Sequence, residues 1–435
     1  MIRTYAATFA GDARMTSAVA RLVELLGDTH LDARIRAAQS LLVLSQTHLK
    51  STHKLQSIRP DRATGCSVAV RVQNAELVHT TQLLPVDSVG QSVSEQLESV
   101  LQQLDQLLNE FAAGRQDLVK LNVYLQDSTD RRLFFNQFSK WCEGQGSPSV
   151  TSVATPLPGG ARIAIDAVFA GRKSDGGFRP ATAGLPATGV RSSIRNRARS
   201  LPPGDVVYVS GQAAVGDLVS ATRDTLRDLF RTLEYMKLSR GHIVQLKCFL
   251  APMQRVDEVD QQIATAFAPG HVPPVSHVEW QSGSRPIEIE IVAWAPHQKS
   301  SDSVTYVTPP WMKSSAVFSR VARVHGNDRL YVSELTVSTA GESAATVRSL
   351  FQQMRQIVIQ GGSDMRHLAK ATYYVSSDQA SRQLNEVRPA IFDPQRPPAA
   401  SKAMVREVGT PGRSMSIDMI AGVLREKSRS GGRQQ

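Results

Sequence analysis

The chain has 435 residues, enough for roughly two to four domains with ordinary hydrophobic cores. Its residues are 41% hydrophobic and 20% charged, which is typical of a folded protein and excludes a largely disordered chain. No apolar run approaches the ~20 residues of a membrane helix, and no signal peptide is recognisable. The three widely separated cysteines favour a reducing cytoplasm.

Positive charge is concentrated in two segments of the chain. The formal net charge is +11; residues 171–200 hold seven basic residues and one acidic residue, and residues 425–435 hold four and one. Both segments have the composition or the terminal position of solvated connectors. The net positive charge is therefore weak evidence for nucleic-acid binding, which we keep only as a minor alternative.

Residues 1–62 differ from the rest of the chain. Apolar residues recur there about every 3.6 positions in SAVARLVELLGD and LDARIRAAQSLLVLSQTHL, which predicts two helices in an N-terminal extension. Beyond this extension a different pattern begins and occurs three times. A repeat of this length is the first feature that a fold prediction has to explain.

Four elements make up each copy of the repeat. The first is a strand–turn–strand segment, LVHTTQLLPV, VVYVSGQAAV or LYVSELTVST, and the second is an amphipathic helix. The third is a strand at 118–125, 243–250 and 368–375, spaced by 125 residues. The fourth is a second helix, followed by a Pro-containing loop and closing strands such as PIEIEIVAWA. Each copy is predicted to be ββαβαββ, with two helices on one face of a mixed sheet.

The predicted boundaries follow from this repeat. They are 1–62 for the helical extension, 63–171, 199–296 and 317–424 for repeats 1, 2 and 3, 172–198 and 297–316 for two exposed linkers, and 425–435 for a basic tail. Asp166, Glu290 and Asp418 occupy one position in all three repeats. Such recurrence favours a shared structural role, such as pairing across the boundary between repeats.

The repeats resemble the RidA/YjgF family of enamine/imine deaminases, also described as L-PSP endoribonuclease-like. The resemblance rests on the strand ending in Ser-Gly-Gln, the strand IVQLKCFL, the Pro-containing loop and the final IEIE strand, and repeat 2 matches best. It implies an α/β (α+β) fold of three chorismate-mutase-like domains. Three copies in one chain are then expected to form an intramolecular, monomeric pseudo-trimer, with sheets inside, helices outside and ligand clefts at the repeat boundaries.

The resemblance also implies which residues carry the chemistry. In the family, an arginine in a Pro-Ala-Arg-Ser loop holds the carboxylate of a 2-imino acid, but the matching positions are Val150, Val275 and Ala400. No neutral side chain reproduces the two-pronged contact of a guanidinium group. We therefore expect a degenerate deaminase site and a chain that binds a small molecule or acts as a scaffold.

Repeat 2 retains more of the family pattern than its neighbours. It keeps Ser210, Gly211 and Gln212 in the turn, which are expected ligand contacts, where the other copies read Thr80-Thr81-Gln82 and Ser333-Glu334-Leu335. It also keeps Glu288, at the position where the family's glutamate positions or activates water. Only a glycine lets the turn backbone approach a ligand closely.

Two further candidates lie two positions after the lost arginine. His277 is a candidate base, because imidazole titrates near neutral pH, and Lys402 is a candidate ligand-binding cation. Plain structural roles compete with these interpretations: Glu288 as a solvated or paired carboxylate, His277 as a half-buried strand residue and Lys402 as a surface or inter-repeat cation. The alternative function is an active imine deaminase that hydrolyses 2-iminobutanoate-type substrates through the cleft of repeat 2.

No cofactor and no metal are predicted. The sequence lacks a phosphate-binding loop, a nucleophile elbow and an H-E-x-x-H motif, and its ten histidines show no paired ligand spacing. The expected partner is a small molecule such as a 2-imino or 2-keto acid, and neither a membrane nor a nucleic acid is expected.

Overall fold

The computed structural model describes residues 2–12, 18–48, 54–171, 196–281, 283–336 and 343–424. The chain divides into two compact units, Met1–Thr52 and His53–Gln435. The predicted linker at 172–198 lies outside the described residues except for 196–198. The predicted basic tail, 425–435, lies outside them entirely.

The first unit is helical, as the apolar spacing predicts, but its described residues form three helices where the spacing predicts two. It contains α1 (Ile2–Asp12), α2 (Val19–Leu25) and α3 (Leu31–His48), which pack around a small core that includes Ala7, Leu22 and Ala37. The helical extension ends earlier than predicted, because residues 54–61 form the strand β1 (Lys54–Asp61). This strand pairs along its length with the first strand of repeat 1 and therefore belongs to the second unit.

Repeats 1 and 2 in the second unit have the predicted ββαβαββ order, and repeat 3 has this order with one additional short strand. Repeat 1 contains β2 (Cys66–Gln73), β3 (Glu76–Thr80), α4 (Val93–Glu110), β4 (Leu118–Leu125), α5 (Arg131–Cys142), β5 (Ser149–Ala154) and β6 (Ile163–Gly171). Repeat 2 contains β7 (Ala198–Leu201), β8 (Asp205–Gln212), α6 (Leu218–Tyr235), β9 (Ile243–Leu250), α7 (Val256–Phe267), β10 (Val275–Glu279) and β11 (Ile287–Ala295). Repeat 3 contains β13 (Val321–Val324), β14 (Arg329–Leu335), α8 (Ala344–Gln360), β15 (Leu368–Val375), α9 (Asp378–Val387), β16 (Ala399–Met404), the short β17 (Glu407–Val408) and β18 (Met415–Gly422).

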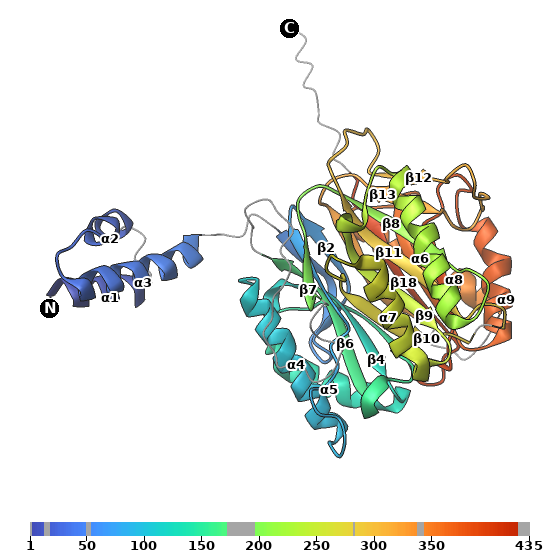
Figure 1. Ribbon diagram of the computed structural model, residues 1–435, viewed down its shortest axis with the longest axis horizontal. Helices are drawn as coiled ribbons and strands as arrows, with labels where there is room; N and C mark the ends of the chain where they lie inside the picture. Colours follow the sequence, from blue (N-terminus) through green and yellow to red (C-terminus); the bar gives the residue numbers. More distant parts are fainter. Residues whose placement is uncertain are drawn as a thin grey trace, which may run out of the picture. The chain divides into compact units, whose positions relative to one another are not determined.

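The long helices lie on the outside of the second unit and the strands lie inside (Figure 1). The first helix of each repeat begins at a capping residue, Ser92, Asp217 or Ser343, whose side chain accepts backbone N–H groups of the first turn. The apolar stripe of each helix then packs on its own sheet, which gives one hydrophobic core per repeat. A fourth cluster, which includes Tyr208 and Tyr331, lies between the inner faces of the sheets.

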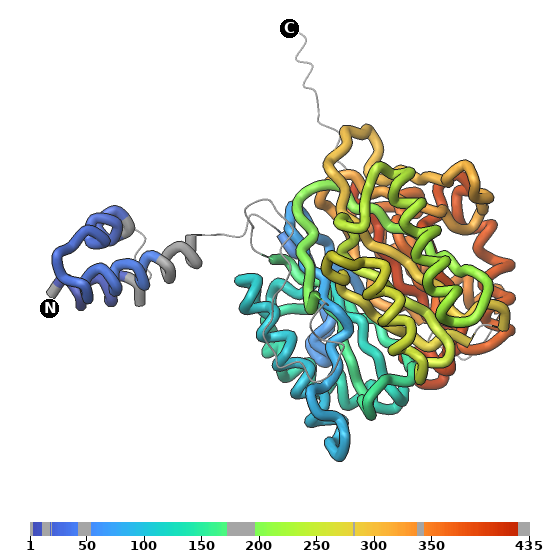
Figure 2. The backbone as a smooth tube through the Cα atoms, in the orientation of Figure 1, coloured from blue at the N-terminus to red at the C-terminus, as the bar shows by residue number. Residues whose placement is uncertain are grey.

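The first strand of each repeat joins the sheet of the repeat before it. β7 of repeat 2 pairs with β3 of repeat 1, β13 of repeat 3 pairs with β8 of repeat 2, and β2 of repeat 1 pairs with β14 of repeat 3. The exchange closes the three repeats into a ring and confirms the predicted fold class. Figure 2 shows how segments far apart in sequence lie side by side as a result. The exchange itself is absent from the prediction, because strand patterning does not specify the pairing partner.

The segment 297–316, predicted to be an exposed linker, packs on repeat 3. It contains β12 (Val304–Val307), which pairs with β13, and Val304 is fully buried. Asp302 anchors its start through Arg396 Nη1 at 2.6 Å and His367 Nε2 at 3.0 Å. The linker prediction is therefore wrong for this part, because paired backbone groups hold the segment in place.

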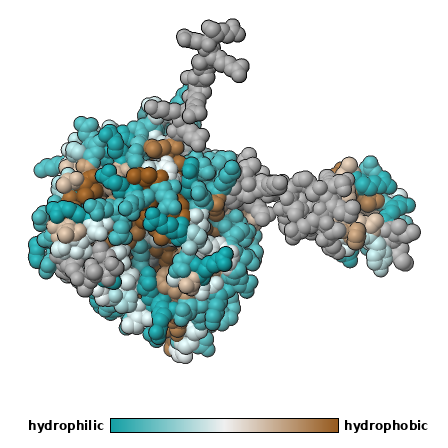
Figure 3. All heavy atoms as spheres, turned by 180° about the vertical axis from the view of Figure 1, so that it is seen from behind, coloured by the Kyte–Doolittle hydropathy of each residue, from teal (hydrophilic) through white to brown (hydrophobic). Residues whose placement is uncertain are grey.

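Hydrophilic residues cover most of the face of the second unit seen in Figure 3, and its hydrophobic patches there are small. Within the described residues, no helix combines the length and apolar character needed to traverse a bilayer.

Candidate functional site

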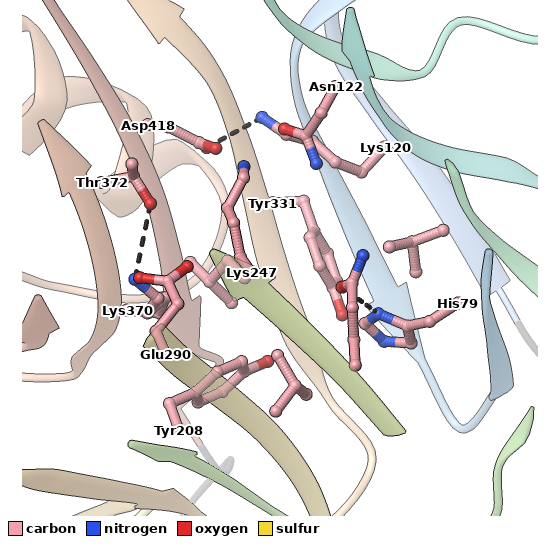
Figure 4. A pocket seen from close by; sticks show the side chains of 14 residues that line it. His79, Lys120, Asn122, Tyr208, Lys247, Glu290, Tyr331, Lys370, Thr372 and Asp418 are labelled. Atoms are coloured by element: carbon pink, nitrogen blue, oxygen red, sulfur yellow. Dashed lines mark hydrogen bonds and ion pairs between the residues drawn. The ribbon is translucent and has the colours of Figure 1, made fainter. Parts of the chain in front are cut away.

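The inner faces of the sheets enclose a small cavity of about 60 Å³ (Figure 4). Its lining includes one lysine from each repeat, Lys120, Lys247 and Lys370, together with Glu290 and Asp418. A cavity of this size holds a few water molecules. It is too small for an organic ligand of ordinary size.

The charged groups of this cavity pair across the repeat boundaries. Lys120 Nζ lies 2.8 Å from Asp418 Oδ1 of repeat 3, and Lys370 Nζ lies 2.5 Å from Glu290 Oε2 of repeat 2. Asp166 of repeat 1 accepts the hydroxyl of Ser276 of repeat 2 at 2.6 Å. The predicted cross-boundary role of the three recurring acids is thus confirmed, and two of the three lysines that line the cavity are paired with a carboxylate of another repeat.

The three boundaries share one hydroxyl contact at the segment that the sequence predicts to be a turn. In the structure this segment is the end of the strand β8 or β14, and in repeat 1 it directly follows β3. In each, a turn hydroxyl accepts the backbone N–H of the position where the family has its arginine: Thr81 from Val275 at 3.3 Å, Ser210 from Ala400 at 2.8 Å and Ser333 from Val150 at 2.9 Å. The turn of repeat 1 is therefore Thr81-Gln82-Leu83, one residue later than the sequence comparison predicts. We call the next residue, Gln82, Gly211 or Glu334, the turn-centre residue.

At the repeat 1/2 boundary, the turn-centre residue Gln82 bridges to the backbone of His277. Gln82 Nε2 donates to the His277 carbonyl at 3.1 Å, and the His277 N–H donates to Gln82 Oε1 at 3.2 Å. The buried imidazole turns the other way, and its Nε2 lies 3.0 Å from Asp260 Oδ1 on α7. This boundary is filled by an amide of the chain itself.

At the repeat 3/1 boundary, the turn-centre residue is Glu334 and its carboxylate is enclosed by donors. Glu334 Oε2 accepts the Ser152 N–H at 2.9 Å, and Oε1 accepts Arg131 Nη2 at 2.6 Å and the Thr410 hydroxyl at 3.1 Å. The Ser152 hydroxyl also lies 3.0 Å from Oε2. This boundary is filled by a carboxylate of the chain itself.

At the repeat 2/3 boundary, the turn-centre residue is Gly211, which has no side chain to extend across. The carboxyl group of Glu288 lies against it, and a Cβ atom at Gly211 would stand 2.0 Å from Glu288 Oε1. Burial raises the pKa of Glu288 to about 7, against the lowering influences of Ser401, Lys370 and Lys402. Glu288 therefore changes charge near neutral pH, as a general acid or base requires.

Repeat 3 places Lys402 near this glutamate, and Arg388 lies beside Lys402. Lys402 Nζ donates to Ser381 Oγ at 2.8 Å and to Asn385 Oδ1 at 3.2 Å, and burial together with Arg388 lowers its pKa. The guanidinium of Arg388 lies 5.0 Å above the Tyr373 ring and donates to the same Asn385 oxygen at 2.6 Å. The Lys402 ammonium group has three hydrogens. Its hydrogen bonds to Ser381 and Asn385 use two of them, so one can be donated to a ligand.

Arg388 is the residue of this site that sequence reasoning missed. Its counterparts 125 and 250 residues earlier are Ile263 and Phe138, which are fully buried in the cores of the other repeats. A charged residue at a core position in one copy alone is the signal that could have revealed it, because burial of a charge is costly without a partner.

The structure brings together three of the six predicted site residues: Gly211, Glu288 and Lys402. The Ser210 hydroxyl accepts the Ala400 N–H and donates to the Ser319 carbonyl at 2.5 Å, so it holds the two repeats together. Gln212 Nε2 donates to Thr232 on α6 at 2.9 Å, on the helix side of the sheet.

His277 and Glu288 do not share a site, although the sequence suggested that they would. Strand side chains alternate between faces, and Val275 and Ile289 pack in the core under the helices of repeat 2. His277 follows Val275 by two positions and faces the helices, whereas Glu288 is adjacent to Ile289 and faces inward. His277 also lies at the repeat 1/2 boundary, against Gln82, whereas Glu288 lies at the repeat 2/3 boundary, against Gly211.

Among the described residues, no group of three or more His, Cys, Asp or Glu side chains is arranged to hold a metal ion.

The comparisons with known proteins agree with this fold. Residues 194–296, which span repeat 2, match the family model described as Endoribonuclease L-PSP. No curated protein sequence matches the chain. Similar solved structures include a Neisseria meningitidis member of the YjgF protein family, with 22% identity, a TM-score of 0.22 and coverage of 28% of this chain and 97% of that chain. A Mycobacterium tuberculosis member of the YjgF/YER057c/UK114 family has 26% identity, a TM-score of 0.21 and coverage of 28% and 100%. Yeast Mmf1 has 24% identity, a TM-score of 0.21 and coverage of 28% and 100%.

The strand exchange defines a ring of three α/β repeats. Residues 194–296 alone match a family model, that of Endoribonuclease L-PSP, so the match to this class is shown for repeat 2.

Proposed function

We propose that this protein binds a small molecule at the repeat 2/3 boundary and that its deaminase site is degenerate. One observation carries the proposal. Side chains of the chain itself fill two of the three equivalent boundaries, through Gln82 and Glu334, whereas the third has Gly211 at that position. The glycine leaves the space beside it to the carboxyl group of Glu288, so a ligand at this boundary would meet an ionisable side chain.

The charges at this boundary favour a ligand with a carboxylate group, such as a 2-keto or 2-imino acid. Lys402 and Arg388 supply positive charge from repeat 3, and Glu288 supplies an ionisable group from repeat 2. Ala400 stands where the family has its arginine, so the two-pronged contact that fixes a carboxylate in one orientation is missing. Binding without efficient turnover is the expected consequence.

Titration calorimetry with 2-oxobutanoate, a stable analogue of the imine, tests this proposal. The wild-type chain is expected to bind it, and Gly211→Gln, which installs the residue of repeat 1, is expected to weaken binding at least tenfold. Gln82→Ala changes the equivalent position at another boundary and serves as the control, with unchanged affinity. Equal binding by wild type and Gly211→Gln, or no binding by either, contradicts the proposal.

A second function, hydrolysis of 2-imino acids, is favoured by Glu288. A carboxyl group with a pKa of about 7 exchanges protons with water near physiological pH, which imine hydrolysis requires. A coupled assay in which a threonine dehydratase generates 2-iminobutanoate measures this activity. Release of 2-oxobutanoate above the protein-free rate that disappears in Glu288→Gln would establish an enzyme, and an equal rate would leave a binding protein.

We also propose that the protein is a cytoplasmic monomer. Each repeat already completes the sheet of its neighbour, so the ring needs no second chain to close. The chain has three cysteines, Cys66, Cys142 and Cys248, and all of them are buried, which accords with a reducing compartment. Sedimentation equilibrium tests the assembly state: a single species with the mass of one chain is expected, and a concentration-dependent dimer or trimer would contradict it.

A further inference from the structure

The carboxylate of Glu334 is surrounded by donors in the way that proteins surround a bound carboxylate. Its side chain is only 6% exposed, and each oxygen has at least two donor atoms within 3.2 Å. Arg131 supplies a charged hydrogen bond at 2.6 Å, and the backbone N–H of Ser152 supplies a fixed one at 2.9 Å. Charged hydrogen bonds of this kind are roughly twice as strong as neutral ones.

Most of these donors belong to the neighbouring repeat. Arg131 begins α5 and Ser152 lies in β5, both of repeat 1, whereas Glu334 extends from β14 of repeat 3. Arg131 Nε lies 3.3 Å from Ser152 Oγ, and its guanidinium lies 4.5 Å above the Phe135 ring. These contacts within repeat 1 hold the arginine in place whether or not Glu334 is present, so the donor set is preorganised.

We propose that the repeat 3/1 boundary is a carboxylate-binding site that the chain fills with its own Glu334 side chain. A small free carboxylate takes the same position when that side chain is removed. In the intact chain, Glu334 acts as a tethered ligand and excludes acidic ligands from this boundary through its high local concentration.

The other boundaries show that this arrangement is particular to the repeat 3/1 boundary. Gln82 contacts the backbone of His277 with a neutral amide, and its boundary has Val256 at the position of Arg131. Gly211 extends no side chain, and its boundary has Ser381 at that position. An arginine at the Arg131 position and a glutamate at the Glu334 position therefore occur together at one boundary and are absent together from the same positions of the other two, as expected for a site and its occupant.

Chemical rescue of Glu334→Ala by acetate tests the proposal. The variant is expected to unfold at a lower urea concentration than wild type, because Arg131 and the Ser152 N–H lose their partner. Added sodium acetate is expected to raise the urea midpoint of Glu334→Ala above its value in equal sodium chloride, in a saturable way. The wild-type midpoint is expected to be the same in acetate and in chloride, because Glu334 occupies the site.

Two variants define the specificity of this rescue. Glu334→Ala/Arg131→Met is expected to lose the acetate effect, because the charged donor is gone. Gln82→Ala removes a turn-centre side chain where no arginine is present, and it is expected to show no acetate effect. Equal midpoints of Glu334→Ala in acetate and in chloride, or an equal acetate effect in Gln82→Ala, would overturn the proposal.

Glu334→Gln keeps the shape of the side chain and provides a second test if Glu334→Ala fails to fold. Its amide has one acceptor oxygen in place of two, so Arg131 and the Ser152 N–H cannot both be satisfied as they are by the carboxylate. A urea midpoint below that of wild type supports a site built for a carboxylate. A midpoint equal to that of wild type contradicts it.

Discussion

The half-buried carboxyl group of Glu288 predicts a specific pH dependence of stability. Burial raises its pKa from the ordinary value of 4.5 to about 7. Between these values the folded chain retains the proton of Glu288 while the unfolded chain has lost it, so the free energy of unfolding decreases as the pH rises. At about 1.4 kcal/mol per pKa unit, the free energy of unfolding decreases by about 3 kcal/mol between pH 4.5 and pH 7. Above pH 7 the contribution of Glu288 changes little.

Glu288→Gln removes this titration and isolates the effect. Urea unfolding of wild type and Glu288→Gln at pH 4.5, 6 and 8 gives the difference in unfolding free energy, in which the titrations of all other groups largely cancel. That difference is expected to shift by about 3 kcal/mol in favour of the variant from pH 4.5 to pH 8. Glu234→Gln, at an exposed position of α6, is the control and is expected to show a constant difference. A constant difference for Glu288→Gln as well would refute the reasoning that Glu288 is half-buried beside Gly211.

Two further predictions concern buried charges that join the repeats. The fully buried Asp205 accepts Arg323 Nε at 2.7 Å and His325 Nδ1 at 2.9 Å, so Asp205→Asn is expected to lower the free energy of unfolding by about 3–5 kcal/mol in urea titrations. A decrease in unfolding free energy below about 1 kcal/mol would mean that the Asp205 carboxylate is solvated. Lys120→Met leaves Asp418 without its 2.8 Å partner and is expected to lower the unfolding free energy by a similar amount, about 3–5 kcal/mol. Adding Asp418→Asn is expected to recover part of that loss, and strictly additive effects of the two substitutions would exclude a direct pair.

The fold was predictable because the sequence pattern of each helix and strand occurs three times in the chain. The stripe at Leu226, Leu229 and Leu233 on α6 is matched by residues at the same spacing in α4 and α8, and all of these side chains are buried. The cross-boundary role of the recurring acids could be inferred in the same way. The exchange of first strands could not, since a four-residue strand such as β7 carries no information on its partner.

The candidate site was predictable only in part, and the reason is physical. Gly211, Glu288 and Lys402 come together because each lies on a strand or turn that the repeat already positions. His277 was assigned to the same site because its spacing from the lost arginine position matches that of Lys402. Its imidazole instead contacts Asp260, a partner on α7 that no spacing rule indicates.

The most direct test of the account is the number of ligands that one chain binds. Equilibrium dialysis with labelled 2-oxobutanoate at saturation measures that number for wild type and for Gly211→Gln. If only the repeat 2/3 boundary is accessible, wild type binds one molecule per chain and Gly211→Gln binds none at the same concentration. Three molecules per chain, or one that persists in Gly211→Gln, would contradict the account.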